Sequence, residues 1–191
     1  MLIVLAFVFL LLDLPLSGYG SLSFDFIPDC VGFALLAAAF LSAARKASPD
    51  AEKKSGRTAW LLWALGAFLA LLACAANDYV LPSLHRDAVP LWLELLLWAS
   101  LIAAGYLLCR RAYGLVCERA CARLCPPSGE ELSAGRKLTD TALLLILLCE
   151  IAAPAGELLG QTLTVILLVL RNFGGILATV CAAKMQYRRQ Y

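Results

Sequence analysis

The sequence predicts an all-α membrane protein: a polytopic bundle of six transmembrane helices arranged as three antiparallel hairpins. Three observations predict this class. The chain has 191 residues, of which 62% are hydrophobic and only 16% charged, whereas soluble domains carry about 45–50% apolar and about 25% charged residues. Apolar runs close to the roughly 20 residues that cross a bilayer recur along the chain. Its Lys and Arg residues gather in alternate connections between those runs, as the positive-inside rule requires.

The six expected helices follow from the apolar runs and their flanking residues. They cover residues 1–16, 27–44, 58–76, 89–109, 140–159 and 162–183 of a single integral-membrane domain spanning residues 1–191. The third run is the clearest, since Thr58 to Ala76 contains nineteen residues and no charge. The first is the shortest and ends near Pro15. Connections between the runs are short, which favours antiparallel packing of neighbours.

The basic residues test the number of spans independently, because Lys and Arg gather in cytoplasmic loops. Fourteen of the 16 lie in three regions: residues 45–57, a basic loop over 110–137, and the tail 184–189. The other two are Arg86, between the third and fourth runs, and Arg171, within the sixth. Six spans with both termini in the cytoplasm satisfy this distribution. The basic loops then face anionic lipid headgroups, while no basic face suits nucleic acid.

Glu150 and Arg171 are charged residues inside the last two apolar runs, where a charge costs roughly 2.5–3.5 kcal/mol. At about 1.5 Å per residue they reach similar depth on adjacent antiparallel helices, so we expect an ion pair. Pro154 removes the usual intrahelical donor from the Glu150 carbonyl and kinks the helix. Asn172 adds an amide at the same level. Glu150, Arg171 and Asn172 therefore form a candidate ligand or proton site at mid-membrane.

Two interpretations of this site stay open. In the structural one, Glu150 and Arg171 fix the last hairpin in register, and Pro154 only bends its helix. In the functional one, Glu150 is the titrating group of a proton or cation relay. A further functional possibility is that an anionic ligand competes with Glu150 for Arg171.

A group of acidic residues lies toward the opposite, outer side of the membrane. Its members are Asp13, Asp25, Asp29, Glu94 and Glu157. Such a group would attract cations to a vestibule. Acids in the first turn of a helix also cap exposed N–H groups and suit the helix dipole, so the second explanation stays open beside the first.

The most distinctive segment runs from Phe24 to Phe33 and reads F-D-F-I-P-D-C-V-G-F. It resembles the D-x-[IL]-P-D-x-[IV]-G-[YF] motif of an uncharacterised family of small bacterial polytopic membrane proteins. The matching residues are Asp25, Pro28, Asp29 and Gly32. The resemblance covers about the first two helices. It implies a location in the bacterial cytoplasmic membrane and implies no particular activity.

The eight cysteines do not predict a metal site. Cys117 and Cys125 share a helix face with Cys109 and Cys121 if the fourth helix continues that far. Cys117 and Cys125 would then lie about 12 Å apart, too far to ligate one zinc ion at bond lengths near 2.3 Å. Cys30 and Cys74, near the outer ends of neighbouring helices, could pair in a disulfide, although chance proximity explains their positions as well.

Catalytic motifs are also missing from the sequence. There is no P-loop, no G-x-S-x-G and no H-E-x-x-H, and the single histidine, His85, lies in an outer loop. We therefore assign no catalytic residue and no cofactor. The expected function is a small transporter-like or ligand-binding membrane protein with a mid-membrane polar site. The alternative is a non-catalytic accessory subunit whose buried charges fix helix packing.

Overall fold

The computed structural model describes residues 1–12, 15–16, 24–25, 29–46, 54–76, 90–122 and 127–187. These residues form six α-helices and two short strands, and the predicted all-α class is confirmed. The elements are α1 (Leu2–Leu11), β1 (Pro15–Leu16), β2 (Phe24–Asp25), α2 (Asp29–Lys46), α3 (Lys54–Ala75), α4 (Leu91–Cys121), α5 (Gly129–Leu159) and α6 (Gln161–Tyr187). The strands pair antiparallel, with Pro15 opposite Asp25.

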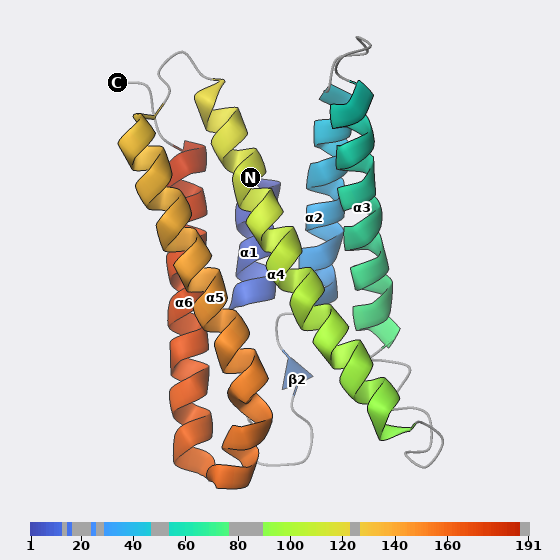
Figure 1. The fold of residues 1–191 in the computed structure, drawn as a ribbon, viewed down its shortest axis with the longest axis vertical. Coiled ribbons are helices and arrows are strands. Elements are labelled where there is room, and N and C mark those ends of the chain that lie inside the picture. The colour runs from blue at the N-terminus through green and yellow to red at the C-terminus, as the bar shows by residue number, and fades with distance from the viewer. Residues whose placement is uncertain are drawn as a thin grey trace.

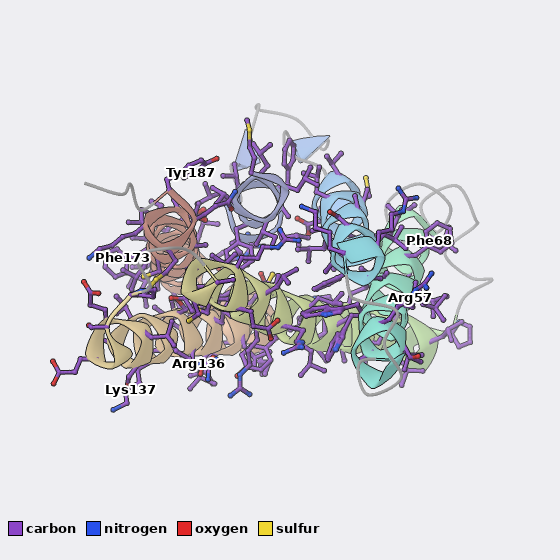
Figure 2. All side chains as sticks on the ribbon, turned by 90° about the horizontal axis from the view of Figure 1, so that it is seen from above. Arg57, Phe68, Arg136, Lys137, Phe173 and Tyr187 are labelled. Atoms are coloured by element: carbon purple, nitrogen blue, oxygen red, sulfur yellow. The ribbon has the colours of Figure 1, made fainter. Side chains whose placement is uncertain are left out.

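The helices lie in two rows, which Figure 2 shows along the axis of the bundle. One row contains α6, α1 and α2, and the other contains α5, α4 and α3. The most extensive contacts join α2 to α3 and α5 to α6, while α1 packs on both α2 and α6. Helix α4 runs diagonally across the bundle and contacts both α3 and α5 (Figure 1). Consecutive helices run in opposite directions (Figure 1).

One end of the bundle carries most of the described basic residues, and we call it the basic end. It is the end at which α2 and α4 stop and α3 and α5 begin (Figure 1). Its residues include Arg45, Lys46, Arg57, Arg119, Arg136 and Lys137. Helix α6 also ends there, and α1 starts on that side of the bundle (Figure 1).

Helix α1 is a short helix wedged between α2 and α6. It has ten residues, about 15 Å of helix, and Phe7 near its middle is fully buried. Two glycines permit this fit. A Cβ on Gly32 of α2 would collide with the Leu10 side chain, and a Cβ on Gly175 of α6 would collide with the Leu11 carbonyl. Helix α1 is therefore in close contact with the backbones of both neighbours.

Three of the described helices are long and apolar enough to cross a membrane, over Gly56–Ala75, Leu95–Cys121 and Thr162–Tyr187. Large apolar side chains on them face outward, with Leu62 63% exposed and Val169 60% exposed. Apolar surface of this extent is unusual on a soluble monomer and matches a lipid environment. The chain is thus a membrane protein with three apolar helices of spanning length. The six spans and the cytoplasmic termini stay predictions.

Three boundaries differ by five residues or more from those that the sequence predicts. The first helix ends at Leu11 instead of residue 16, because Pro15 has no N–H to donate to the Leu11 carbonyl and its ring would clash with that carbonyl in a helix. Pro15 pairs with β2 instead. Residues 110–137 are not one basic loop, since residues 110–121 continue α4 and residues 129–137 begin α5. Apolar side chains such as Val116 and Cys117 are buried in the core and hold this part of α4 against the bundle.

Helix α5 begins early because it has a capping box. The Ser128 hydroxyl accepts a hydrogen bond of 3.2 Å from the Glu131 N–H. In return, the Ser128 N–H donates to a Glu131 carboxylate oxygen at 3.0 Å. Each interaction satisfies an N–H that the first turn of a helix would otherwise leave exposed. The pattern S-x-x-E at residues 128–131 is the sequence signal for this start, which the predicted boundary at residue 140 overlooks.

Candidate functional site

Glu150 of α5 and Arg171 of α6 form an ion pair between adjacent helices. The hairpin that carries them turns at Gly160, whose φ of 122° lies in the left-handed region that glycine adopts readily. Counting about 1.5 Å per residue from this turn, both side chains lie roughly 15 Å along their helices. The expected pairing of the two charges at equal depth is therefore present in the fold.

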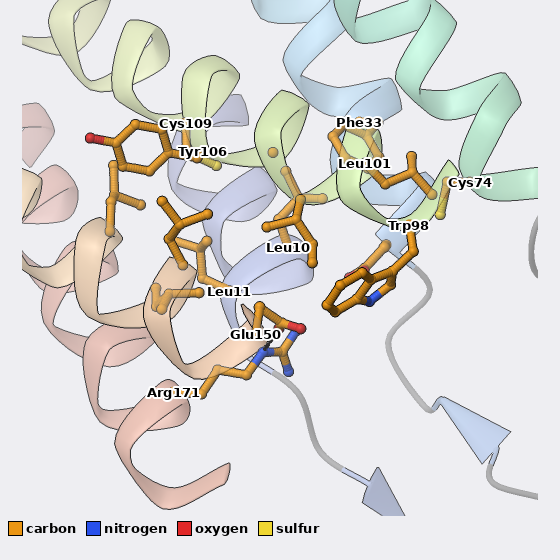
Figure 3. A pocket seen from close by; sticks show the side chains of 16 residues that line it. Leu10, Leu11, Phe33, Cys74, Trp98, Leu101, Tyr106, Cys109, Glu150 and Arg171 are labelled. Atoms are coloured by element: carbon orange, nitrogen blue, oxygen red, sulfur yellow. Dashed lines mark ion pairs between the residues drawn. The ribbon is translucent and has the colours of Figure 1, made fainter. Parts of the chain in front are cut away.

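The ion pair lies at the wall of a cavity of about 180 Å³. All six helices contribute lining residues, from Leu10 of α1 to Arg171 of α6. Figure 3 shows Leu10, Leu11 and Trp98 around the pair, which a dashed line marks. The cavity is small beside the roughly 300–1,000 Å³ of pockets for drug-sized ligands. Its size suits an ion with its waters or a small molecule.

The cavity contains more acidic than basic groups. Asp29, the first residue of α2, lines it together with Glu150 and Arg171. Two carboxyl groups therefore share the space with one guanidinium, which gives a formal charge of −1 when all three are ionised. Burial is substantial, because only 23% of the Glu150 side chain and 15% of the Arg171 side chain are exposed. A charge imbalance in such surroundings favours a positively charged guest.

Three aromatic rings also line the cavity. They belong to Phe33 of α2 and to Trp98 and Tyr106 of α4. Aromatic faces attract cations, and the attraction is worth about 2 kcal/mol or more when the cation is desolvated. The rings and the excess carboxylate therefore favour the same kind of ligand.

Two helix ends meet at this cavity. Helix α1 stops at Leu11 and α2 begins at Asp29, and both residues line it. The carbonyl end of a helix carries partial negative charge and its amino end partial positive charge. Helices that stop inside a membrane bundle and direct their ends at a cavity are a recurring way to build ion and substrate sites.

The remaining predicted site residues do not all join the cavity. Asn172 is not among its lining residues, and its side-chain amide donates to the Leu168 carbonyl at 3.1 Å. Pro154 and Glu157 lie on α5 and Glu94 lies on α4, in parts of those helices whose side chains are not described. Asp25 forms part of β2, again without a described side chain. Asp13 lies outside the described residues.

The sequence did not predict that Asp29 and the aromatic rings would share a cavity with Glu150. The sequence analysis assigns Asp29 to the outer acidic group and assigns the three aromatic residues to no candidate site. The sequence signal that could have joined them is Pro15, because it ends the first helix early and so brings the start of α2 into the cavity that contains Glu150.

The structure describes seven of the eight cysteines. In the described part of the chain, no group of three or more His, Cys, Asp or Glu residues is placed to hold a metal ion. Cys109 and Cys117 are buried thiols, and Cys125 lies outside the described residues. Cys30 and Cys74 are also thiols, so no disulfide joins them.

No protein family, curated protein or solved structure matches this chain. The resemblance of residues 24–33 to a bacterial membrane family stays a prediction. What the cavity can bind follows from its own groups: two carboxyls, one guanidinium and three aromatic rings.

Proposed function

We propose that this chain is a small transporter-like membrane protein that binds a small organic cation, such as a protonated amine, in the cavity beside Glu150. The observation that carries the proposal is the excess of carboxylate over guanidinium in a cavity lined by aromatic rings. A cation there gains the attraction of Asp29 and Glu150 without displacing Arg171. An anion would have to displace Glu150 from Arg171 and would face the second carboxylate.

The proposal includes a membrane arrangement. Six segments cross the bilayer, the first of them the apolar run 1–16 that contains the short helix α1. Both termini then lie in the cytoplasm, and the basic end meets anionic lipid headgroups. The membrane is the bacterial cytoplasmic membrane, as the resemblance of residues 24–33 implies. The outer acidic residues then lie on the side from which a cation would reach the cavity, where their charge raises its local concentration.

The experiment is a titration of the purified protein in neutral detergent with ethylammonium chloride, followed by calorimetry, with sodium chloride as the reference. Glu150→Gln should weaken ethylammonium binding at least about tenfold, since a hydrogen bond to a charged group contributes about 1.5–3 kcal/mol. Asp29→Asn should do the same while leaving the Glu150–Arg171 pair intact. Glu130→Gln removes one carboxylate from an exposed position in the first turn of α5 and serves as the control.

Binding of ethylammonium that is equal in the wild type, Asp29→Asn and Glu130→Gln would refute a cation site. A cation site would also be refuted if acetate bound more tightly than ethylammonium and Arg171→Gln abolished the acetate binding, because the cavity would then bind an anion. Trp98→Leu gives a further test, because loss of the ring should weaken ethylammonium binding without changing any charge.

The accessory-subunit alternative draws on a different observation. Glu150 and Arg171 join two helices that also approach closely at Gly174, where a Cβ would lie 3.0 Å from the Ala142 carbonyl oxygen. A pair that only fixes this hairpin would leave ethylammonium without a site. The calorimetric titration therefore separates the two functions.

A further inference from the structure

A second cavity, of about 350 Å³, opens at the basic end between α3, α4 and α5. Three arginines and one carboxylate line it: Arg110, Arg111, Arg136 and Asp140. It shares no lining residue with the cavity beside Glu150. Its formal charge is +2, opposite in sign to that of the first cavity.

Arg111 is held in place before any ligand arrives. Its guanidinium lies over the Trp60 ring, 4.3 Å from the ring centroid, and one of its terminal nitrogens lies 3.4 Å from the Glu118 carboxylate. The Nε of Arg111 is nevertheless buried without a hydrogen-bond partner. A ligand does not reach that buried Nε, but 36% of the Arg111 side chain is exposed. The fixed guanidinium can therefore bind an acceptor through its other nitrogens at little entropic cost.

The other two arginines also have donors to spare. Arg110 Nε donates to Asp140 at 3.1 Å, which leaves its terminal nitrogens for another acceptor. Among the described residues, Arg136 forms no ion pair and no hydrogen bond. Guanidinium groups bind phosphate oxygens through paired, charge-assisted hydrogen bonds. The group that this cavity suits best is therefore a phosphate.

The arginine cavity continues into an apolar groove between α3 and α4. The groove has a volume of about 450 Å³ and shares Trp63 and Leu107 with the arginine cavity. Its other lining residues carry no charge and are Ala59, Leu62, Gly66, Ala104 and Leu108. Gly66 and Ala104 lie beyond the shared residues on the side away from the basic end. An apolar groove next to a phosphate site matches a lipid, whose acyl chain and headgroup need these two surroundings together.

We infer that the arginine cavity and the α3–α4 groove together bind one anionic phospholipid. Its phosphate contacts Arg110, Arg111 and Arg136, and the first part of an acyl chain lies along Gly66 and Ala104. Trp63 lies at the junction, as expected of an aromatic ring at a membrane interface. The positive charge of the cavity selects a lipid with net negative charge over a zwitterionic one.

The test compares dioleoyl phosphatidylglycerol with dioleoyl phosphatidylcholine, added to the purified protein in neutral detergent, by the rise in thermal unfolding temperature. Phosphatidylglycerol should stabilise the wild type at lower concentration than phosphatidylcholine. Arg136→Gln should weaken this preference about tenfold or more. Lys137→Gln is the matched control, because it removes the same charge from the next residue, which does not line the cavity. Figure 2 shows both side chains on α5.

A second variant tests the groove separately from the charges. A Cβ on Gly66 would meet nothing within 4 Å, and Gly66 lines the groove, so we expect Gly66→Leu to fill the groove with little displacement of α3 and α4. It should leave the lipid-free unfolding temperature unchanged or raised, and weaken the phosphatidylglycerol effect about tenfold. Neither variant touches the cavity beside Glu150, so this inference and the proposed function succeed or fail separately.

Two results would overturn the inference. Equal losses in Arg136→Gln and Lys137→Gln would mean that lipid charge acts on the whole basic end and not on this cavity. If inorganic phosphate reproduced an Arg136-dependent stabilisation that Gly66→Leu left unchanged, the cavity would bind a soluble phosphate group and not a lipid.

Discussion

At the scale of single residues, Glu150 and Arg171 can each be buried as a charge only because the other compensates it. With 23% and 15% of their side chains exposed, neither charge can be solvated well without the other. Removing one partner of such a pair leaves an uncompensated charge, whereas removing both restores a neutral interior. The single variants are therefore expected to be much less stable than the double variant.

This asymmetry gives a prediction for stability. Glu150→Gln and Arg171→Gln should each lower the free energy of unfolding by on the order of 3 kcal/mol. The double variant should have a free energy of unfolding close to that of the wild type, because it leaves no uncompensated charge. In the proposed function the charges are retained for a ligand and not for stability. The measurement is denaturant unfolding in mixed micelles for all four proteins. A double variant as unstable as the worse single one would instead favour a purely structural pair.

The pairing itself could be predicted from the sequence, since it depends only on helical rise and on one hairpin. The rest of the cavity could not be predicted in this way. Asp29 and Glu150 are more than a hundred residues apart, and their meeting depends on which face α2 presents to the bundle. Periodicity within one segment carries no information on that contact.

At the scale of helices, the packing of α1 depends on the absence of side chains at Gly32 and Gly175. We predict that Gly175→Ala lowers the free energy of unfolding by about 1–3 kcal/mol, because its Cβ would meet the Leu11 carbonyl. Gly66→Ala, where a Cβ has open space, should raise it by up to about 1 kcal/mol through helix propensity. Unfolding of both variants in the same micelles checks this. Equal effects would mean that α1 does not pack on α6 as described.

Helix boundaries could be predicted from the sequence where an apolar run coincides with the whole helix, and not where a helix extends beyond its apolar run. The long apolar run of α3 predicts its position to within a few residues. Helices α4 and α5 extend well beyond their apolar runs, because buried residues on one face hold a helix that is charged on the other. The predicted start of α5 at residue 140 is wrong although S-x-x-E marks the capping box at Ser128, and the early end of α1 depends also on the pairing of β1 with β2.

At the scale of the whole molecule, charge is separated along the bundle. The basic end carries a cavity with excess arginine, and the cavity beside Glu150 carries excess carboxylate. In the proposed arrangement, Lys and Arg hold the basic end in the cytoplasm. The acidic cavity then lies deeper in the membrane. The proposed orientation would therefore place the proposed anion site at the inner surface and the proposed cation site within the bilayer.

Reporter fusions test this orientation. Green fluorescent protein fused after residue 50 or residue 191 should fluoresce, and alkaline phosphatase fused after residue 83 should be active, if six helices cross and both termini are cytoplasmic. The three helices that are apolar enough by themselves, Gly56–Ala75, Leu95–Cys121 and Thr162–Tyr187, are an odd number and would put the two termini on opposite sides. Helix α5 makes the even number more favourable, because its 31 residues pack antiparallel along α6. An active phosphatase after residue 191, together with fluorescence after residue 50, would mean an odd number of crossings after residue 50. The basic tail of α6 would then lie outside, against the charge distribution that predicted the topology.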